Sequence, residues 1–190
     1  MAVQVYTFKI SYEGCDKKIW RIFEVSSNYD LARLGYMVLS SFGTKAYHLF
    51  NIEYKDVIYE TDIENYGQFY LLRDTKLAEL KIKIGDHLHM IYDFGTEQHF
   101  DIELINITAM PKGTGRSYPR VIEGKGRGII DDMSADELME IIKSTDQNGK
   151  SDFIISTGFG DEMVWDYRKY NIDHDNGLLK GEIDIIKGRL

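Results

Sequence analysis

The stretch KIKIGDHLHMIYDFGTEQHFDIELINITAM, residues 81–110, decides the fold. Two runs rich in β-branched and aromatic residues flank a short polar segment with a glycine, which is typical of a β-hairpin. If Gly95 and Thr96 form a two-residue turn, Tyr92 lies directly opposite His99. The sequence therefore predicts an antiparallel pair of strands, with the residues 92–100 at its tip.

The hairpin contains His87, His89 and His99, which together suggest a zinc site. Because side chains alternate between the two faces of a strand, the two-residue turn places His87 and His89 on one face and His99 on the other. We therefore expect no metal site within the hairpin, and polar roles for these residues on a sheet face. A zinc site completed by His48 from another strand stays open as an alternative.

Further segments follow the same pattern of hairpins with a few helices between them. Residues 3–12 and 18–25 predict another antiparallel hairpin, and residues 30–43 a helix with Asp30 as its N-cap. Ser134 and Glu137 form a capping box at the start of a second helix. Strands are expected at 46–54 and 153–159, and residues 175–188 fit helix and strand equally. The expected fold is α+β, mostly antiparallel hairpins with a few packed helices, in a single domain 1–190.

The composition favours a cytoplasmic globular protein over a membrane, secreted or general duplex-binding protein. The 190 residues carry a net charge of −8, with 43% hydrophobic residues and one cysteine. One cysteine allows no internal disulfide, which favours a cytoplasmic setting. No apolar run approaches the roughly 20 residues that span a bilayer, and no secretory signal is evident. An acidic total disfavours general binding to duplex nucleic acid.

A basic, glycine-rich segment at 110–128 interrupts this acidic background. Its glycines free the backbone to approach an anion, although no Walker or GxGxxG pattern is present. A contact with phosphate or single-stranded nucleic acid is one interpretation, and an ordinary solvated loop is the other. The candidate anion-binding residues are Lys112, Arg116, Arg120, Lys125 and Arg127.

One catalytic interpretation concerns the hairpin tip. A carboxylate beside an imidazole orients it and raises its basicity, so Asp93 and His99 could form a general base. The alternative is that Asp93 caps the turn and His99 bonds to backbone. Cys15 lies in a turn and is expected to be inert.

The segment NIDHDNGLLKGE, residues 171–182, resembles an EF-hand calcium loop. Asn171 and Asn176 stand where such a loop carries Asp and Gly. An acidic turn without calcium is the other interpretation, and we expect no cofactor.

In order along the chain, several motifs resemble the plasmid pRiA4b ORF-3-like proteins, described as passenger proteins of insertion elements. The segments are KKIWRIFEV, DLARLGYMVLSSFG, HLFNI, YDFGTEQHF, YPRVIEGKGRGIIDD and WDYRKYNIDHDN, and the resemblance covers about 5–176, leaving 177–190 as a C-terminal extension. The residues that carry it are Trp20, Arg21, His48, Tyr92, Asp93, Phe94, Gly95, His99, Tyr118, Pro119, Gly124, Asp131, Asp132, Trp165, Asp166 and Asn176.

The chain also departs from the family pattern. Gly35 stands where a histidine is common, Phe50 replaces the second histidine of a His-Leu-His motif, and two cysteines near Asp131 are missing. If relatives hold a metal with those groups, this chain has lost it. The resemblance implies an α+β fold and an association with mobile elements, without a secure reaction or ligand.

Two functions follow as expectations. The first is a non-enzymatic binding module that contacts a protein or a single-stranded nucleic acid through the hairpin tip and the basic segment. The second is a small hydrolase or transferase in which His99 is the base, Asp93 orients it, and Arg120 or Arg127 binds an anionic substrate.

Overall fold

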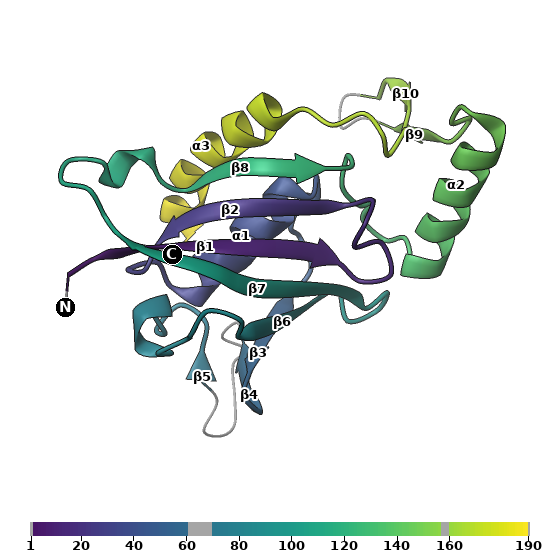
Figure 1. The fold of residues 1–190 in the computed structure, drawn as a ribbon. Helices are drawn as coiled ribbons and strands as arrows, with labels where there is room; N and C mark the ends of the chain where they lie inside the picture. Colours follow the sequence, from purple (N-terminus) through teal and green to yellow (C-terminus); the bar gives the residue numbers. More distant parts are fainter. Residues whose placement is uncertain (1, 61–69, 157–159, 190) are drawn as a thin grey trace.

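The computed structural model describes residues 2–60, 70–156 and 160–189, and within them one sheet of eight strands dominates (Figure 1). The strand order is β5-β4-β3-β6-β7-β1-β2-β8, and neighbours are antiparallel except for the parallel pair β4 and β5. The strands are β1 (Gln4–Tyr12), β2 (Trp20–Ser26), β3 (Phe50–Tyr54), β4 (Val57–Glu60), β5 (Tyr70–Leu71), β6 (His87–Tyr92), β7 (Gln98–Ala109) and β8 (Arg120–Lys125). The fold is therefore α+β, as predicted.

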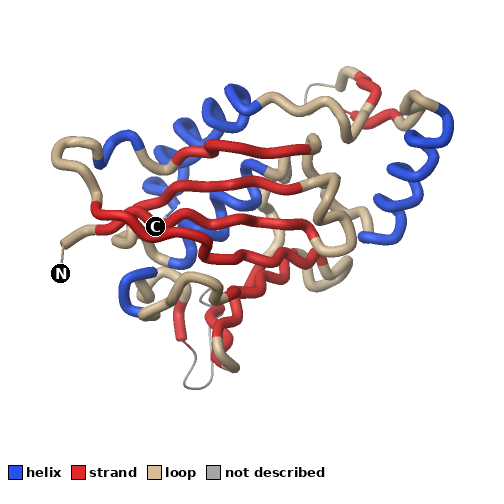
Figure 2. The backbone as a smooth tube through the Cα atoms, in the orientation of Figure 1, coloured by secondary structure: helices blue, strands red, loops and turns tan. Residues whose placement is uncertain are grey.

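Helices cover one face of this sheet. Both α1 (Leu31–Ser41) and α3 (Ile172–Arg189) lie on the same face, as Figure 2 shows, and α3 also packs against β8. Outside that layer lie α2 (Ala135–Asn148) and a two-stranded sheet of β9 (Ile154–Ser156) and β10 (Glu162–Val164). Short 3₁₀ helices occur at Leu77–Glu79 and Gly115–Ser117. No helix among the described residues is long and apolar enough to cross a membrane.

The core lies between the sheet and α1. Strand β6 alternates strictly, with Leu88, Met90 and Tyr92 buried and His87 and His89 exposed. This period of two puts every second side chain of the strand against the helices. The predicted hairpin of β6 and β7 is thus confirmed.

Its register differs from the predicted one by one residue. Tyr92 lies opposite Gln98, and His99 lies opposite Ile91. The connection is a five-residue loop, Asp93–Glu97, in which both end residues have positive φ, 56° and 50°. Because one residue of register reverses the faces, the prediction that His99 points away from His87 and His89 is wrong.

All three histidines instead lie on the open face of the sheet, each beside a carboxylate. His87 Nδ1 is 2.8 Å and His89 Nδ1 is 3.8 Å from the same Asp101 oxygen, whereas His99 Nδ1 is 3.6 Å from Glu13. Among the described residues, the one group of three side chains with mutually close metal-ligand atoms contains none of these histidines.

Both predicted helix starts are confirmed. The Asp30 side chain accepts a hydrogen bond from the Arg33 N–H at 2.8 Å. In α2, Ser134 and Glu137 make both bonds of the capping box, and Gly149 ends the helix in the left-handed conformation. The hairpin of β1 and β2 is also present. The strand expected at 153–159 appears as β9, and residues 157–159 lie outside the described ones.

Two interpretations of the second half of the chain are wrong. Part of the segment predicted as a basic loop is the edge strand β8, which pairs with β2. The EF-hand-like segment forms the first turns of α3, so its residues 171–182 cannot wrap around calcium as a loop does. Trp165 is buried, whereas Trp20 is only half-buried, like Ile22 on the same face of β2.

Candidate functional site

Three motif residues from distant parts of the chain meet at the edge of the helical layer. Strand β3 pairs with β6, with Phe50 opposite Tyr92, and the Asp93 N–H extends the ladder by donating to the Leu49 carbonyl at 3.0 Å. This bond sets His48, which immediately precedes Leu49, beside Asp93. The segment that follows β8 brings Asp132 to the same place.

The imidazole of His48 lies between two carboxylates. Its Nε2 is 2.7 Å from Asp132 Oδ1 and 3.6 Å from Asp93 Oδ2. One ligand atom from each of the three residues lies within 4.8 Å of the others. One imidazole nitrogen and two carboxylate oxygens form a donor set that suits divalent transition metals. We call His48, Asp93 and Asp132 the histidine cluster.

Hydrogen bonds hold the carboxylates of the histidine cluster in place. Asp93 accepts from the Gly95 N–H at 3.1 Å and from the Thr96 hydroxyl at 2.6 Å, so it caps the turn as one interpretation predicted. Asp132 accepts from the Tyr47 hydroxyl. The bonds from Tyr47 and His48 hold the pKa of Asp132 below its usual value, and Asp132 raises the pKa of Tyr47 to about 12. Asp132 is therefore an anion and Tyr47 a neutral donor near neutral pH.

The neighbouring Asp131 ties the site to the core. It accepts hydrogen bonds from the buried Tyr92 hydroxyl at 2.9 Å and from the Lys45 N–H at 2.8 Å. Burial, followed by the charge of Asp131, raises the pKa of Tyr92 well above its usual value. The motif residues Tyr92 and Asp131 thus position the segment that carries Asp132.

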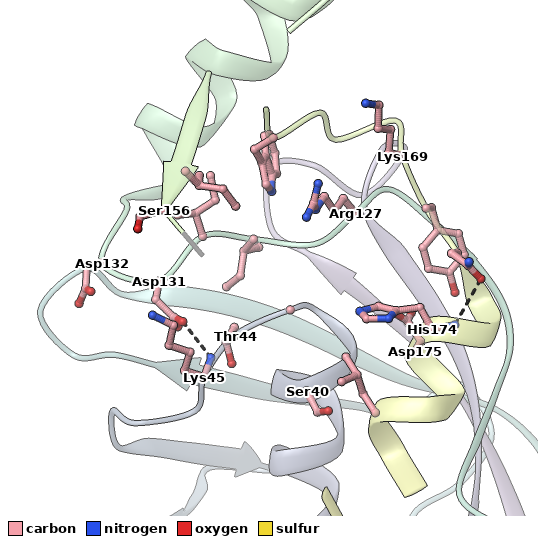
Figure 3. Close-up of a pocket in the computed structure, with 18 of the residues that line it drawn as sticks. Ser40, Thr44, Lys45, Arg127, Asp131, Asp132, Ser156, Lys169, His174 and Asp175 are labelled. Atoms are coloured by element: carbon pink, nitrogen blue, oxygen red, sulfur yellow. Dashed lines mark hydrogen bonds between the residues drawn. The ribbon is translucent and has the colours of Figure 1, made fainter. Parts of the chain in front are cut away.

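A cavity of about 710 Å³ adjoins the histidine cluster (Figure 3). Its walls are the end of α1 with residues 43–45, the segment 127–132, β9, the segment 165–171 and the first turns of α3. Asp131 and Asp132 line the cavity on the side of the histidine cluster, and His174 of α3 lies on the other side. Part of the wall is apolar, through Ile129, Ile130, Phe153, Ile155, Trp165 and Leu178.

Three of the lining side chains are cations without a carboxylate partner. Within the described residues, Lys45, Arg127 and Lys169 have no carboxylate oxygen within 4.0 Å of their side-chain nitrogens. Among the described residues, the Arg127 guanidinium donates only to the sulfur of Met163, at 3.3 Å. The acidic residues of the wall, in contrast, are engaged, since Asp175 binds Arg21 and the other two hold the contacts given above.

One lining hydroxyl has no hydrogen-bond partner among the described residues. The Ser40 side chain is in the last turn of α1 and is 3% exposed, and its Oγ contacts no donor or acceptor there. Leaving a buried hydroxyl unpaired costs about 1–3 kcal/mol. The Tyr170 hydroxyl is also buried, and it interacts with the Asp175 carboxylate.

The predicted catalytic pair is not brought together. Asp93 faces His48, and His99 lies on the open face of the sheet beside Glu13. The backbone carbonyl of His99 accepts a hydrogen bond from the Glu13 N–H at 3.0 Å. The enzyme hypothesis in its predicted form, with His99 as a base that Asp93 orients, is therefore wrong.

The predicted anion-binding residues are also separated. Lys112 precedes β8, Arg120 begins it and Arg127 follows it, and six residues of strand span about 20 Å. Arg120 binds Glu24 at 2.6 Å, and the Lys125 side chain is exposed on the edge strand. The Arg116 side chain lies outside what the structure describes. Of the five, only Arg127 lines the cavity.

The other motif residues have structural contacts. Arg21 is buried, and a Cβ at Gly124 would lie 2.6 Å from the Tyr170 oxygen and 2.9 Å from Arg21 Cδ. Asn176 makes two hydrogen bonds to the backbone of β8. Asp166 binds Arg168, which lowers the pKa of that carboxyl to about 2. Tyr118 and Pro119 are joined by a cis peptide, Phe94 is exposed at the hairpin tip, and Gly95 donates to Asp93.

Sequence reasoning missed Ser40, Lys45, Lys169 and Tyr170 as site residues. Lys169 and Tyr170 lie within the motif WDYRKYNIDHDN, directly before the N-terminal end of α3, which could have drawn attention to them. Ser40 and Lys45 carry no local signal, because their role depends on which segments fold over the end of α1.

The sequence motifs and the fold agree with known proteins. The family model of the plasmid pRiA4b ORF-3-like protein matches residues 4–174. The chain belongs to this family. Its fold is similar to the crystal structure of MM3350, a protein of unknown function from Methanosarcina mazei Go1, with a TM-score of 0.73 and 18% identity over 92% of this chain and 97% of that one. A search of curated proteins found no match. The family assignment from the motif order is thus confirmed.

Proposed function

We propose that this pRiA4b ORF-3-like protein is a non-enzymatic binding protein that holds a small organic molecule in the cavity beside the histidine cluster. The observation that carries this proposal is the Ser40 hydroxyl, which is buried in the cavity wall without a partner. A volume of about 710 Å³ lies within the range of small-molecule sites, roughly 300–1,000 Å³. The mixed wall of apolar side chains and a few polar groups is also typical of such sites.

A macromolecular partner receives less support. Binding to single-stranded nucleic acid relies on a continuous basic groove with exposed aromatic side chains. Here the basic residues lie at both ends of β8, and Arg120 is paired with Glu24. A protein or nucleic-acid partner at the hairpin tip and basic segment stays a prediction, as do the mobile-element association and the cytoplasmic location.

A screen of small molecules by thermal unfolding tests the proposal. Bound ligand at about 100 times its Kd stabilises the fold by about 2.7 kcal/mol, which corresponds to several degrees in Tm. We expect at least one compound to raise Tm in the wild type and to do so less or not at all in Leu178→Trp, where the larger indole projects from the apolar wall into the space of the ligand. Lys180→Trp, on an exposed position of the same helix, is the matched control and keeps the response. If no compound raises Tm, or if Leu178→Trp responds like the wild type, the proposal is wrong.

The histidine cluster favours a second candidate, a metal-dependent hydrolase. A divalent ion held by His48, Asp93 and Asp132 would lower the pKa of a bound water and supply a nucleophile at the edge of the cavity. In this candidate the catalytic histidine is His48 and not His99. Its requirement is that the bond between His48 and Asp132 opens to admit the ion.

Calorimetric titration with Mn²⁺ and Zn²⁺ tests this candidate. We expect one site in the wild type and none in His48→Gln or Asp132→Asn. The exposed pair of His87 and Asp101, also 2.8 Å apart, provides matched control variants, His87→Gln and Asp101→Asn, that leave the site intact. Equal loss of binding in both sets would assign the metal to nonspecific surface contacts and remove the hydrolase.

A further inference from the structure

The charges around the cavity point to one class of ligand. Arg127, Lys45 and Lys169 line it without carboxylate partners, whereas each carboxylate in its wall already accepts hydrogen bonds from the protein. An unpaired guanidinium is a strong site for a bidentate contact with phosphate or carboxylate oxygens. The wall therefore offers positive charge that no group of the described protein neutralises at close range.

The placement of Arg127 makes it the central cation. Its backbone is fixed, since the Arg127 N–H donates to the Tyr167 carbonyl at 2.7 Å. The following Gly128 has no room for a Cβ, which would lie 2.1 Å from the Phe42 carbonyl oxygen. In Figure 3 the Arg127 side chain lies at the top of the cavity, and His174 and then Ser40 lie below it. The backbone is therefore fixed beside the cavity, and the Arg127 side chain lines the cavity without an ion pair among the described residues.

The polar and apolar groups of the wall add a second requirement, that the ligand also has an organic body. The buried Ser40 hydroxyl has no hydrogen-bond partner among the described residues, and Ile129, Phe153 and Leu178 offer apolar surface. An inorganic anion alone would leave that apolar surface in contact with water. An organic body against it gains the free energy of removing apolar area from water.

We infer that the ligand is a small organic anion whose phosphate or carboxylate group pairs with Arg127 and whose body lies against the apolar wall with a polar atom within reach of Ser40. This inference rests on the proposed function and specifies its ligand class. Lys45 and Lys169 contribute long-range attraction, which added salt reduces.

Three probes with the same aromatic body separate the contributions of charge and shape. They are 2-naphthyl phosphate, 2-naphthoate and the neutral 2-naphthol, each titrated by calorimetry at constant ionic strength. We expect at least one of the two anions to bind about tenfold or more tightly than 2-naphthol, since a charge-assisted bond is about twice as strong as a neutral one. Binding of the phosphate alone or of the carboxylate alone supports the inference and names the group.

Arg127→Gln is the decisive variant, because glutamine keeps a hydrogen-bonding side chain and removes the charge. It should weaken the anions by about tenfold and leave 2-naphthol unchanged. Arg120→Gln is the matched control at the other end of β8, and we expect it to bind all three probes like the wild type. Ser40→Ala, which removes one hydroxyl, should weaken an anion by a smaller factor, about threefold to tenfold.

The outcomes separate the inference from the proposed function. Equal affinities for 2-naphthol and the anions, or anion binding unaffected by Arg127→Gln, overturn the anionic class while a small-molecule site remains. Failure of both anions to bind at about 1 mM, a free energy weaker than about −4 kcal/mol, also overturns it. The proposed function fails only if the compound screen finds no ligand that Leu178→Trp excludes.

Discussion

The guanidinium of Arg21 is fully buried, and its Nε donates to the Asp175 carboxylate at 2.7 Å. The other guanidinium nitrogens donate to the carbonyls of Trp20, Lys125 and Ser41, at 2.8–3.0 Å. The Tyr170 ring covers the guanidinium at 4.2 Å. One side chain thereby joins β2, β8, the end of α1 and the start of α3, of which the two helix ends line the cavity.

We predict that Asp175→Asn destabilises the fold by about 3 kcal/mol, because it leaves a buried guanidinium without its counter-ion. The asparagine has nearly the same size, so the loss reports charge and not packing. Urea unfolding measures it, and Asp173→Asn, exposed in the same turn of α3, is the control with a change within about 0.5 kcal/mol. Equal stabilities of the two variants would show that the carbonyl contacts alone suffice for Arg21.

A second prediction concerns the edge strand β8. The Asn176 side chain accepts from the Val121 N–H and donates to the Val121 carbonyl, each at 2.9 Å, so α3 completes the hydrogen bonds of one residue on the strand edge. Asn176→Ala should cost about 1–2 kcal/mol and speed exchange of the Val121 amide hydrogen. Asn176→Asp keeps the acceptor and should keep more of the amide's protection than alanine does. Unchanged exchange in Asn176→Ala would argue against the role in the edge.

Strand and helix positions could be predicted because they follow from local chemistry. Alternation marked β6 and β7, and the Asp30 and Ser134 caps marked two helices. The register of the hairpin could not be predicted, since it depends on positive φ at Asp93 and at Glu97. Non-glycine residues adopt that conformation only where surrounding contacts impose it. Here the Asp93 side chain bonds its own loop, and its N–H bonds Leu49.

Only part of the candidate site could be predicted, because the sequence shows single residues and not how distant segments meet. Motif residues identified His48, Asp93 and Asp132 singly, but their meeting depends on the pairing of β3 with β6 and on the course of the chain after β8. The charges and glycines of the edge strand β8 did not predict a strand. It forms because it pairs with β2, a contact between segments distant in the sequence. An unpaired hydroxyl such as that of Ser40 cannot be recognised before the segments around it are placed.

Titration of Asp132 gives a third prediction. Hydrogen bonds from Tyr47 and His48 hold its pKa below that of an ordinary aspartate. A depressed pKa means that these contacts stabilise the fold above the pKa of the unfolded chain, near 3.9, and that this contribution is lost as the pH falls through the folded value. Carbon-detected NMR of the carboxyl should show the titration below the usual range, and Tyr47→Phe with His48→Gln should move it up. His87→Gln, far from Asp132 on the open face, should leave it in place; an unchanged pKa in the double variant would refute the assignment.

The last prediction explains two departures from the family pattern together. The resemblance to the family predicts histidines at the positions of Gly35 and Phe50; in the fold these two residues touch. A Cβ at Gly35 would lie 2.1 Å from Cε2 and 2.5 Å from Cζ of the Phe50 ring, so the ring fills the space that a side chain on α1 would use. Gly35→Ala should therefore cost about 1–2 kcal/mol net, since overpacking of about 1–3 kcal/mol exceeds the roughly 1 kcal/mol that alanine gains over glycine in a helix.

Gly177→Ala is the matched control, because a Cβ there meets no atom within 4 Å and the position is also helical. It should stabilise the fold by up to about 1 kcal/mol, opposite in sign to Gly35→Ala. Adding Phe50→Leu to Gly35→Ala should recover part of the loss, as the shorter side chain makes room for the methyl group, so the two changes are not additive. Urea unfolding of the wild type, Gly35→Ala, Phe50→Leu and the double variant measures the coupling. A Gly35→Ala protein as stable as Gly177→Ala would show that the Phe50 ring moves aside freely and would contradict this prediction.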